Sequence, residues 1–425
     1  MSELLSVGLD VGTTTTQLIL SRLTVENRAS AFSVPEMEIT KRKILYKSPV
    51  HFTPLIRDEL VDGEAIKKLV EQEYKAAGIT RPEVDTGAVI ITGETSRKEN
   101  AQTVLRELSG FAGDFAVATA GPDLESVLAA KGSGAVQLSE QTGQRVLHMD
   151  IGGGTCNMAL IENGVIKSTG CLNVGGRLIK HTGGKVSYVS PAVKSLTDLT
   201  AGEYAKPGQM EGLAKLLTLA LEMAAGLRPA TALLEKLTSA GTASKWQPPE
   251  KPVVISFSGG VAACMEAGGD YGDLGGILGT TIRESLLCKG EFRICNDAIR
   301  ATVIGAGSYA TQLSGSTIYY SNVELPLQNL QIGEDITVIE NTATDYESIK
   351  KLARQLLDNA GHKPVYAVTR QDVAKALGHC IGILAPKKPC LCIDRVHLQP
   401  DSILDVGRPV GSCLPVVVKT IIFEH

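Results

Sequence analysis

The 425-residue sequence has few aromatic residues and little excess charge of either sign. Phe, Trp and Tyr make up 4% of the chain, and the formal net charge is −4. Bulk binding of nucleic acid needs a concentrated basic surface, whereas the basic stretches at 41–43 and 387–388 are short and fit solvated surface. The composition therefore argues against a nucleic-acid-binding protein.

Long apolar runs are also missing. No stretch approaches the roughly 18 apolar residues of a transmembrane helix, so we expect no membrane partner. The first residues carry the acidic Glu3 where a signal peptide would be basic, and their apolar run is short. We expect a location in the cytoplasm or an equivalent reducing space.

Several common site motifs are absent as well. The nine cysteines include no Cys-x-x-Cys pair, and most lie in apolar runs, so we expect them to serve packing. The chain has no GxxxxGK[ST] loop and no GxGxxG after its first strand. A zinc site, a Walker-type NTPase and a dinucleotide-binding fold are therefore disfavoured.

Glycine, by contrast, is abundant, and patterns of strands and helices alternate along the chain. The 44 glycines indicate many tight turns and close backbone approaches, and the alternation is typical of an α/β protein. We expect a loop or hinge at 131–143. The expected strands are 4–10, 15–20, 87–93, a hairpin at 145–161, 253–257, 364–369, 390–396 and 414–423. The expected helices are 64–78, one from about 95 toward 109, 123–131, several within 208–240, 345–360 and 371–379.

The most informative feature is a repeated segment. LDVGTTTTQLIL at 9–20 aligns with MDIGGGTCNMAL at 149–160, which places Asp10 on Asp150 and Gly12 on Gly152. Each copy reads as an apolar strand, an acidic residue, a Gly/Thr turn and a second apolar strand. Either copy alone could be an ordinary glycine-rich hairpin, but the matched pair favours a shared function.

Those residue types point to phosphate chemistry. A Gly/Thr turn lets backbone N–H groups converge on phosphate oxygens, and threonine hydroxyls add donors. An aspartate beside phosphates would repel them unless a cation lay between. Asp10 and Asp150 facing one another therefore imply Mg²⁺ held largely through water. We predict a duplicated clamp on one polyphosphate, with donors placed where phosphoryl-transfer charge develops.

A third segment complements the two hairpins. VVISFSGGVAAC at 253–264 is an apolar strand that ends in Ser258, Gly259 and Gly260, where glycine would let a base and ribose approach the backbone. A plain strand-to-helix turn is the alternative. The small residues at 301–310 fit close helix packing, either at a hinge or only in a core. We expect His148 to be packed or exposed rather than a metal ligand.

In this order, the three segments resemble the two phosphate motifs and the adenosine motif of the superfamily of actin, Hsp70 chaperones and sugar kinases. The resemblance implies duplicated actin-like (ribonuclease H-like) ATPase domains, at 1–145 and 146–310, that close over Mg-ATP, with a small C-terminal α/β region at 311–425. It makes Asp10 and Asp150 the catalytic, magnesium-associated acids and NVGGRLI at 173–179 the first interdomain connection. The implied nucleotide-binding residues are Gly12, Thr13, Thr14, Thr15, Gly152, Gly153, Gly154, Thr155, Ser258, Gly259 and Gly260.

Within that superfamily the chain resembles the reactivating factors of ethanolamine ammonia-lyase over essentially its full length. The strings that carry the resemblance are ITGETSRKENA, ATAGPDLESVLAAKGSGA, CLNVGGRLI and LPVVVKTIIF. It implies a chaperone-like ATPase of ethanolamine utilization. Its client is an adenosylcobalamin-dependent lyase, from which ATP drives release of damaged cobalamin. An ethanolamine bacterial microcompartment would fit this setting, and a homodimer stays open.

Other functions on the same fold were weighed. Related ATPases supply a polar catalytic residue between the phosphate motifs, where Glu94 and Lys98 are weak candidates that could equally cap a helix. A small-molecule kinase would need a substrate pocket, for which residues 99–102 could be argued. A non-enzymatic, filament-forming scaffold is the third reading. Phosphorylated product and ATP-dependent light scattering would separate these readings.

Overall fold

A computed structural model describes most of the chain. The described residues are 2–12, 15–27, 37–56, 60–92, 100, 103–104, 108, 116–119, 122–239, 246–250, 253–309, 311–313, 318–325, 327–340, 344–369, 373–394, 396, 402–407, 409 and 414–420.

The first sheet has the strand order β3-β2-β1-β7-β8. Strand β2 runs antiparallel to both β1 and β3, whereas β7 and β8 continue the sheet in parallel with β1. Its strands are β1 (Ser2–Val11), β2 (Thr15–Asn27), β3 (Met37–Lys47), β7 (Thr86–Ile91) and β8 (Ala116–Thr119), and β4 (His51–Phe52) pairs with β2. A small separate pair consists of β5 (Leu55–Ile56) and β6 (Leu60–Val61).

Helix α1 (Gly63–Ala77) covers one face of this sheet. It begins at Asp62, whose side chain accepts a hydrogen bond from the amide of Ala65 at 2.9 Å, and it ends at Gly78 in the left-handed conformation. Its apolar side packs on the odd-numbered residues of β1, which share one face because side chains alternate along a strand. The even-numbered face of β1 is thereby left for another element.

The second sheet repeats the first. Its strand order is β11-β10-β9-β14-β15, with three antiparallel strands followed by two parallel ones, as in the first sheet. The strands are β9 (Val146–Ile151), β10 (Cys156–Glu162), β11 (Val165–Leu172), β14 (Val254–Ser258) and β15 (Phe292–Ile294). This repetition of one topology confirms the predicted duplicated actin-like fold.

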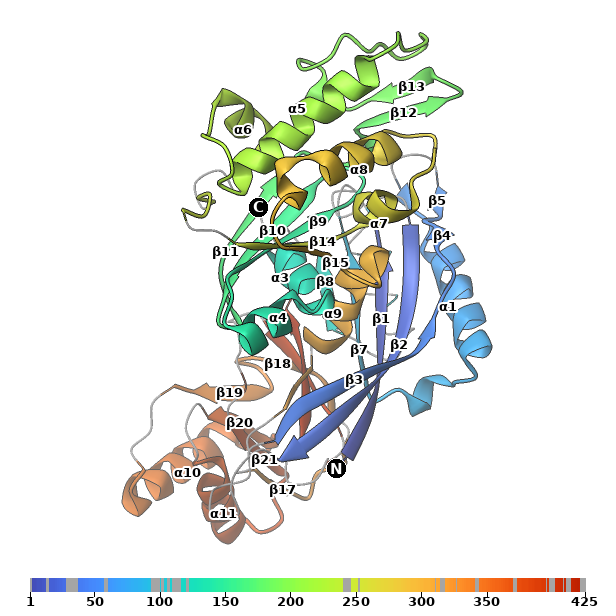
Figure 1. The fold of residues 1–425 in the computed structure, drawn as a ribbon. Coiled ribbons are helices and arrows are strands. Elements are labelled where there is room, and N and C mark those ends of the chain that lie inside the picture. The colour runs from blue at the N-terminus through green and yellow to red at the C-terminus, as the bar shows by residue number, and fades with distance from the viewer. Residues whose placement is uncertain are drawn as a thin grey trace.

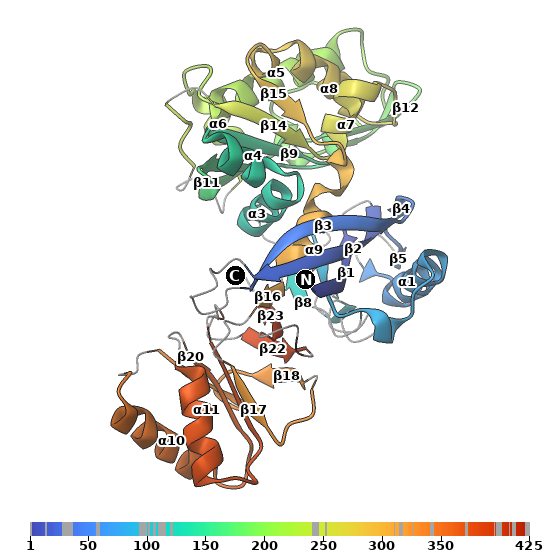
Figure 2. The ribbon, with the colours of Figure 1, turned by 60° about the horizontal axis from the view of Figure 1, so that its bottom comes forward.

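The two halves exchange helices. After the first sheet, α3 (Pro122–Gly132) and α4 (Ala135–Thr142) pack on the second sheet, whereas α9 (Ala301–Tyr309), which follows the second sheet, packs on β1, β2 and β7 of the first. Figures 1 and 2 show α3 beside the green second half and α9 against the blue first sheet. The crossing of α3 and α9 therefore joins the two halves.

Glycine permits that crossing. A Cβ atom at Gly132 would lie 1.8 Å from the carbonyl oxygen of Ala301, and one at Gly305 would lie 2.0 Å from that of Leu128. Real Cβ atoms do not approach backbone so closely, so the two helices touch backbone to backbone. This confirms the close helix packing predicted for 301–310.

The second half carries further elements, most of them on the outer face of its sheet. Helices α5, α7 and α8 form with the odd-numbered residues of β9 the largest hydrophobic cluster of the described chain. The bounds are β12 (Ile179–Thr182), β13 (Lys185–Val189), α5 (Gln209–Ala224), α6 (Ala232–Leu237), α7 (Gly260–Ala267) and α8 (Gly275–Glu284).

The C-terminal region forms two four-stranded sheets, β16-β23-β22-β18 and β17-β21-β20-β19, and in Figure 2 it lies beyond the first sheet. Helices α10 and α11 pack on the second of these. The bounds are β16 (Thr311–Leu313), β17 (Tyr319–Ser321), β18 (Leu327–Gln331), β19 (Ile336–Ile339), α10 (Tyr346–Ala360), β20 (Val365–Thr369), α11 (Ala374–Leu384), β21 (Cys390–Asp394), β22 (Ser402–Val406) and β23 (Pro415–Thr420).

Two predictions about connections were wrong. The Gly/Ser-rich stretch 131–143, predicted as a loop or hinge, holds helix α4. Only Ser133 and Gly134 form a turn there, and Ala135 and Ser139, four residues apart on one face of the helix, are buried. Residues 173–179 do not pass between the halves, because they fold back on the second hairpin. The connecting segment is 122–142. The helix expected from about 95 to 109 lies largely outside the described residues.

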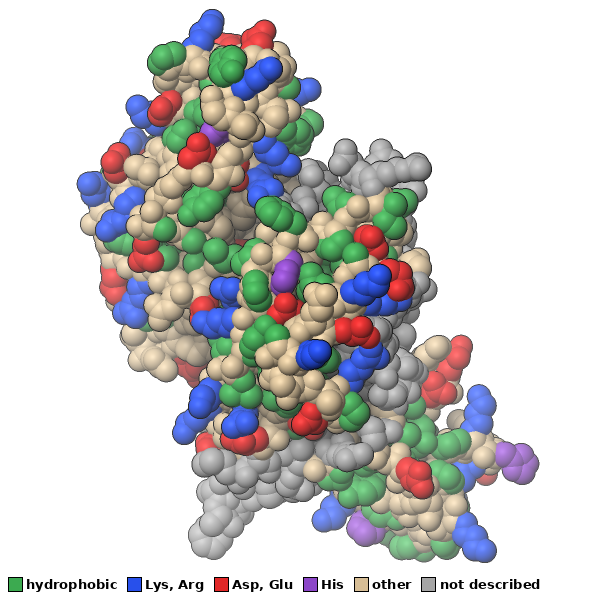
Figure 3. Space-filling model, turned by 90° about the vertical axis from the view of Figure 1, so that its right-hand side faces the viewer, with side chains coloured by type: hydrophobic (Ala, Val, Ile, Leu, Met, Phe, Trp, Pro, Cys, Tyr) green, Lys and Arg blue, Asp and Glu red, His purple; other side chains and the backbone are tan. Residues whose placement is uncertain are grey.

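The surface mixes residue types. On the face drawn in Figure 3, the side on which Figure 1 places α1, β4 and β5, basic, acidic and apolar side chains are interspersed. Exposed apolar side chains in this part of the chain are Val50, Phe52, Leu55 and Ile56. Among the described helices, none has the length and apolar character needed to cross a membrane.

Candidate nucleotide site

The two hairpins predicted from the repeat have the same geometry. In the first, Asp10 pairs with Gln17 across the strands, and the amide of Gly12 donates to the carbonyl of Thr15 at 2.9 Å. In the second, Asp150 pairs with Asn157, and Gly152 donates to Thr155 at 2.9 Å. Gly153 and Gly154 are exposed at the tip of the second turn. Each hairpin thus presents a carboxylate beside a tight turn.

The aspartates come together although they are far apart in the sequence. Burial raises the pKa of Asp10 to about 7; a hydrogen bond from Thr92 opposes the rise, and the nearby charge of Asp150 adds to it. Burial raises the pKa of Asp150 to about 6, against the effect of hydrogen bonds from Ser258 and Thr302. Two carboxylates in this setting resist joint ionisation unless a cation compensates them.

This pair fits the Mg²⁺ that the fold implies. Repulsion between the two carboxylates and their loss of hydration would both be relieved by a divalent ion, and carboxylate oxygens are ligands that Mg²⁺ accepts. Among the described residues, no three His, Cys, Asp or Glu side chains are clustered as a metal cage.

A buried histidine supports Asp150. The hydroxyl of Ser258 donates to Asp150 Oδ1, and His148 Nε2 lies 3.0 Å from the same hydroxyl oxygen. Burial lowers the pKa of His148 to about 3, so its ring is neutral. Because Ser258 directs its proton to the carboxylate, Nε2 of His148 is the donor to Ser258. Of the two alternatives predicted for His148, packed or exposed, the structure shows the packed one.

The third predicted segment lies beside the second hairpin. Strand β14 runs parallel to β9, which places Ser258 level with Asp150. Gly259 has φ +91°, and a Cβ there would lie 2.2 Å from the carbonyl oxygen of Ile151, so this position requires glycine. Gly260 begins helix α7. The backbone next to Asp150 thus carries no side chain at Gly259 or Gly260.

Two supports of the turns were missed by sequence reasoning. The hydroxyl of Thr53 donates to the carbonyl of Gly12 at 2.7 Å. On the other hairpin, the amides of Gly176 and Arg177 donate to the carbonyls of Gly152 and Gly153 at 3.1 and 2.6 Å. The aliphatic stem of the half-buried Arg177 lies beside Gly153, and its guanidinium pairs with Asp273 at 3.6 Å. The sequence pointed to Arg177 only through its position within the segment NVGGRLI.

The predicted site residues divide into three groups. Those brought together are Asp10, Gly12, Thr15, Asp150, Gly152, Gly153, Gly154, Thr155, Gly259 and Gly260. Ser258 is fully buried and contacts Asp150, so the structure gives it a place beside the acid. Thr13, Thr14, Glu94 and Lys98 lie outside the described residues.

One short turn of the second half reaches every part of the site. In the segment 297–302, which includes the 3₁₀ turn η6 (Ala298–Arg300), the carbonyl of Ala298 accepts from Gly259 at 2.8 Å. The carbonyl of Ile299 accepts from Gln17 at 3.4 Å, and the hydroxyl of Thr302 donates to Asp150 at 3.4 Å. This turn links the adenosine motif, the first hairpin and the second acid.

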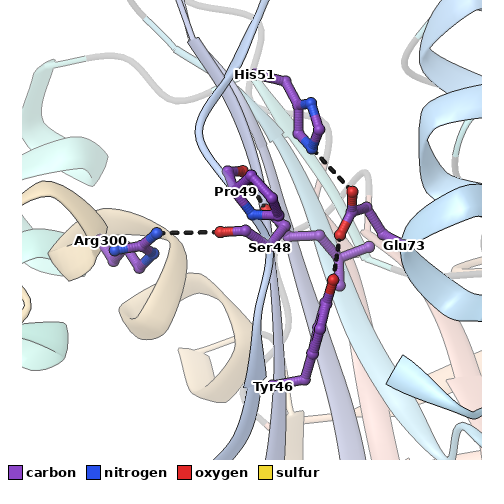
Figure 4. A network of polar contacts seen from close by, with 7 residues as sticks. Tyr46, Ser48, Pro49, His51, Glu73 and Arg300 are labelled. Carbon is purple, nitrogen blue, oxygen red and sulfur yellow. Dashed lines mark hydrogen bonds and ion pairs between the residues drawn. The ribbon is translucent and has the colours of Figure 1, made fainter. Parts of the chain in front are cut away.

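The same turn is bound by a segment of the first half, residues 47–53, which we call the strap. Lys47 pairs with Asp297 at 2.5 Å, and Arg300 donates to the carbonyl of Ser48 at 3.0 Å. Figure 4 shows the other end of the strap, where His51 contacts the buried Glu73 of α1 at 2.8 Å. The strap therefore connects α1, the first turn and the second half.

Comparison with known proteins shows the family of the chain. The sequence matches the family described as Ethanolamine utilisation protein EutA over residues 2–338 and 333–424. The chain belongs to the EutA family. A relative from Salmonella typhimurium, the ethanolamine ammonia-lyase reactivase EutA, is 38% identical and is matched over 99% of both chains. The Escherichia coli protein of the same name is 36% identical over the same shares.

Solved structures similar to this EutA chain are more distant. A Ppx/GppA family member from Aquifex aeolicus is 14% identical, with a TM-score of 0.40 over 62% of this chain and 69% of that one. The ethanolamine utilization protein EutJ from Carboxydothermus hydrogenoformans is 15% identical, with a TM-score of 0.35 over 71% and 89%.

Proposed function

We propose that this EutA chain is an ATPase that reactivates ethanolamine ammonia-lyase, using ATP to drive release of damaged adenosylcobalamin so that intact cofactor can enter. The observation that carries the proposal is the pair of matched hairpins whose acids, Asp10 and Asp150, lie near enough for the charge of Asp150 to raise the pKa of Asp10. The names of the full-length relatives supply the client. Direct contact with cobalamin is not required.

In this proposal each half holds part of the nucleotide. The turns at Gly12 and Gly152 would bind the phosphates through backbone N–H groups, with the ion pair of Arg177 and Asp273 beside the second turn. Gly259 and Gly260 would accommodate the nucleoside. Asp10 and Asp150 would hold Mg²⁺ through water, and the ion would offset charge on the phosphates during hydrolysis.

The chain itself can carry the nucleotide state to the client. The turn 297–302 contacts the adenosine motif, Asp150 and Gln17, and the strap holds that turn from the first half. Loss of the γ-phosphate would change contacts at both hairpins, and thereby the angle between the halves about the α3–α9 crossing. A ligand shifts such an equilibrium only through different affinity for its two states. The client would be released or held according to that angle.

The setting belongs to the proposal as well. Catabolism of ethanolamine would place this chain in the cytoplasm, within or beside a bacterial microcompartment together with the lyase.

Replacement of Asp150 tests the site. We expect Asp150→Ala to lower Mg-dependent ATP hydrolysis by at least about 100-fold, as removal of a group that stabilises transition-state charge does. Phosphate release is measured with and without lyase, and circular dichroism checks the fold. The exposed Asp198→Ala serves as the control. Unchanged ATP hydrolysis by a folded Asp150→Ala protein would contradict the assignment of the site. Detection of a phosphorylated small-molecule product would favour a kinase.

A further inference from the structure

Two buried amide side chains stand beside the acids of the nucleotide site. Gln17 is 2% exposed and Asn157 is 4% exposed, and they occupy equivalent positions in the two hairpins. Each pairs across the strands with an aspartate, Gln17 with Asp10 and Asn157 with Asp150. Residues directly opposite in an antiparallel pair share one face of the sheet. Each amide therefore lies on the same face as its acid.

The orientation of both amides is fixed by their partners. Gln17 Nε2 donates to the carbonyl of Ile299 at 3.4 Å, and Asn157 Nδ2 donates to Glu125 Oε2 at 2.7 Å. Both partners are acceptors, so the amide nitrogens, not the oxygens, must face them. In each case the partner belongs to the segment at the start of the exchanged helix, α9 or α3, so the arrangement is duplicated like the hairpins themselves.

The oxygens of the same two amides have no partner. Gln17 Oε1 and Asn157 Oδ1 are buried and unpaired, and they are the two amide oxygens in this condition among the described residues. A buried acceptor left without a donor is costly, and native proteins normally satisfy such groups. Asn100, another amide of the first half, shows the usual state, because its oxygen and nitrogen bind the amide and carbonyl of Val61 at 2.9 and 2.8 Å.

A hydrated Mg²⁺ would supply the missing donors. Mg²⁺ retains most of its water when it binds to proteins, and each bound water directs its hydrogens outward toward acceptors. Asp10 and Asp150 provide two charged acceptors on this face. Amide oxygens provide acceptors without further charge, which would otherwise add to the repulsion between the two acids.

We propose that Gln17 and Asn157 complete the magnesium site as positioning residues, their amide oxygens accepting hydrogen bonds from the water shell of the ion. The inference rests on the proposed nucleotide function. It assigns one acid and one amide to each half. The duplicated site then consists of four residues rather than two.

Metal binding in the ADP complex tests this. With saturating ADP, the concentration of free Mn²⁺, which replaces Mg²⁺ here, is measured by electron paramagnetic resonance. The affinity for ADP without metal is measured separately in EDTA. We expect Gln17→Met and Asn157→Leu each to weaken Mn²⁺ binding by about tenfold or more, the usual effect of losing an outer-shell partner. ADP affinity in EDTA should stay at the wild-type value. Gln17→Glu retains an acceptor oxygen and adds negative charge near the ion, so it should bind Mn²⁺ at least as tightly as the wild type.

Controls separate this role from a structural one. Asn100→Leu removes a half-buried amide whose oxygen and nitrogen are both paired with Val61, and it should leave Mn²⁺ affinity unchanged. If either main variant does not fold, Gln17→Ala and Asn157→Ala replace them. Wild-type Mn²⁺ affinity in both hairpin variants would overturn the inference while leaving the proposed function intact. The same holds if a variant loses as much affinity for metal-free ADP as it loses for Mn²⁺. Absence of ADP-dependent Mn²⁺ binding in the wild type would overturn both.

Discussion

At the scale of single residues, the site is defined by two acids whose ionisation the fold resists. The pKa of Asp10 is raised from 3.8 to about 7 and that of Asp150 to about 6, with burial the largest cause in both. Thr92 supports the first acid, and Ser258 and Thr302 support the second. The ligand-free site is therefore under electrostatic strain that a cation would relieve.

This strain predicts how the stability of the ligand-free protein depends on pH. Asp10 binds its proton more tightly in the folded protein than in the unfolded chain. Its contribution to the stability of the fold is therefore fully present below about pH 4 and is lost as pH rises through about 7. Asp10→Asn should reduce this loss. At pH 8 its free energy of unfolding should exceed that of the wild type by at least about 1 kcal/mol, the free energy of roughly one pKa unit. Urea unfolding at several pH values measures the effect.

The exposed Asp198→Asn is the matched control and should follow the wild-type pH profile. Parallel profiles for wild type and Asp10→Asn would contradict the electrostatic account of the first acid.

Much of the site at this scale could be predicted from the sequence, and the reason is local. Asp10, Gly12, Asp150 and Gly152 lie in contiguous hairpins, so their spacing reports their geometry directly. Thr53, Thr92 and Thr302 could not be found, because each is brought to the site by an element distant in sequence and none carries a motif of its own. Arg177 was missed because its segment was assigned to a connection between domains.

At the scale of elements, the crossing of α3 and α9 connects the halves. Gly132 and Gly305 allow the helix backbones to touch, and Gly8 of β1 similarly faces Val303 of α9, with a Cβ there 2.6 Å from a carbonyl oxygen. The sequence predicted close packing from small residues at helical spacing. It did not predict that α4 follows α3, because the two glycines that flank Ser133 dominated the composition of that stretch.

Gly132→Ala should force α3 and α9 apart. A methyl group there meets the backbone of Ala301 at 1.8 Å, and backbone cannot rotate away as a side chain can. We expect a loss of about 1–3 kcal/mol, as for other overpacked sites, seen as a lower denaturant midpoint. Gly212→Ala in α5, where nothing lies within 4 Å, should instead be neutral or stabilising by up to about 1 kcal/mol. Equal behaviour of the two variants would contradict this packing role.

At the scale of the whole molecule, contacts between the halves converge on the turn 297–302 and on the strap. The sequence predicted two related halves, as the repeated topology confirms; the cleft between them stays a prediction. The predicted domain boundaries at 145/146 and 310/311 stay a prediction, since exchanged helices give each half a segment from the other. Contacts such as that of Lys47 with Asp297 join residues far apart in sequence, so no local pattern could reveal them.

A charge swap tests the strap. Lys47→Asp would place two acids together and should speed dissociation of a fluorescent ADP analogue by about twofold to fivefold, the scale of a partly exposed ion pair. The double variant Lys47→Asp with Asp297→Lys restores opposite charges and should restore the rate. Failure of the double variant to recover would mean that Lys47 acts other than through Asp297.

The central claim is ATP-driven reactivation, and its most direct test is cobalamin release from inactivated ethanolamine ammonia-lyase. Release is followed spectroscopically with wild type or Asp150→Ala, with and without Mg-ATP. We expect release only with the wild type and Mg-ATP together, followed by recovered lyase activity when adenosylcobalamin is added. Equal release without nucleotide, or with Asp150→Ala, would contradict the account, because neither the hairpins nor their acids would then be needed.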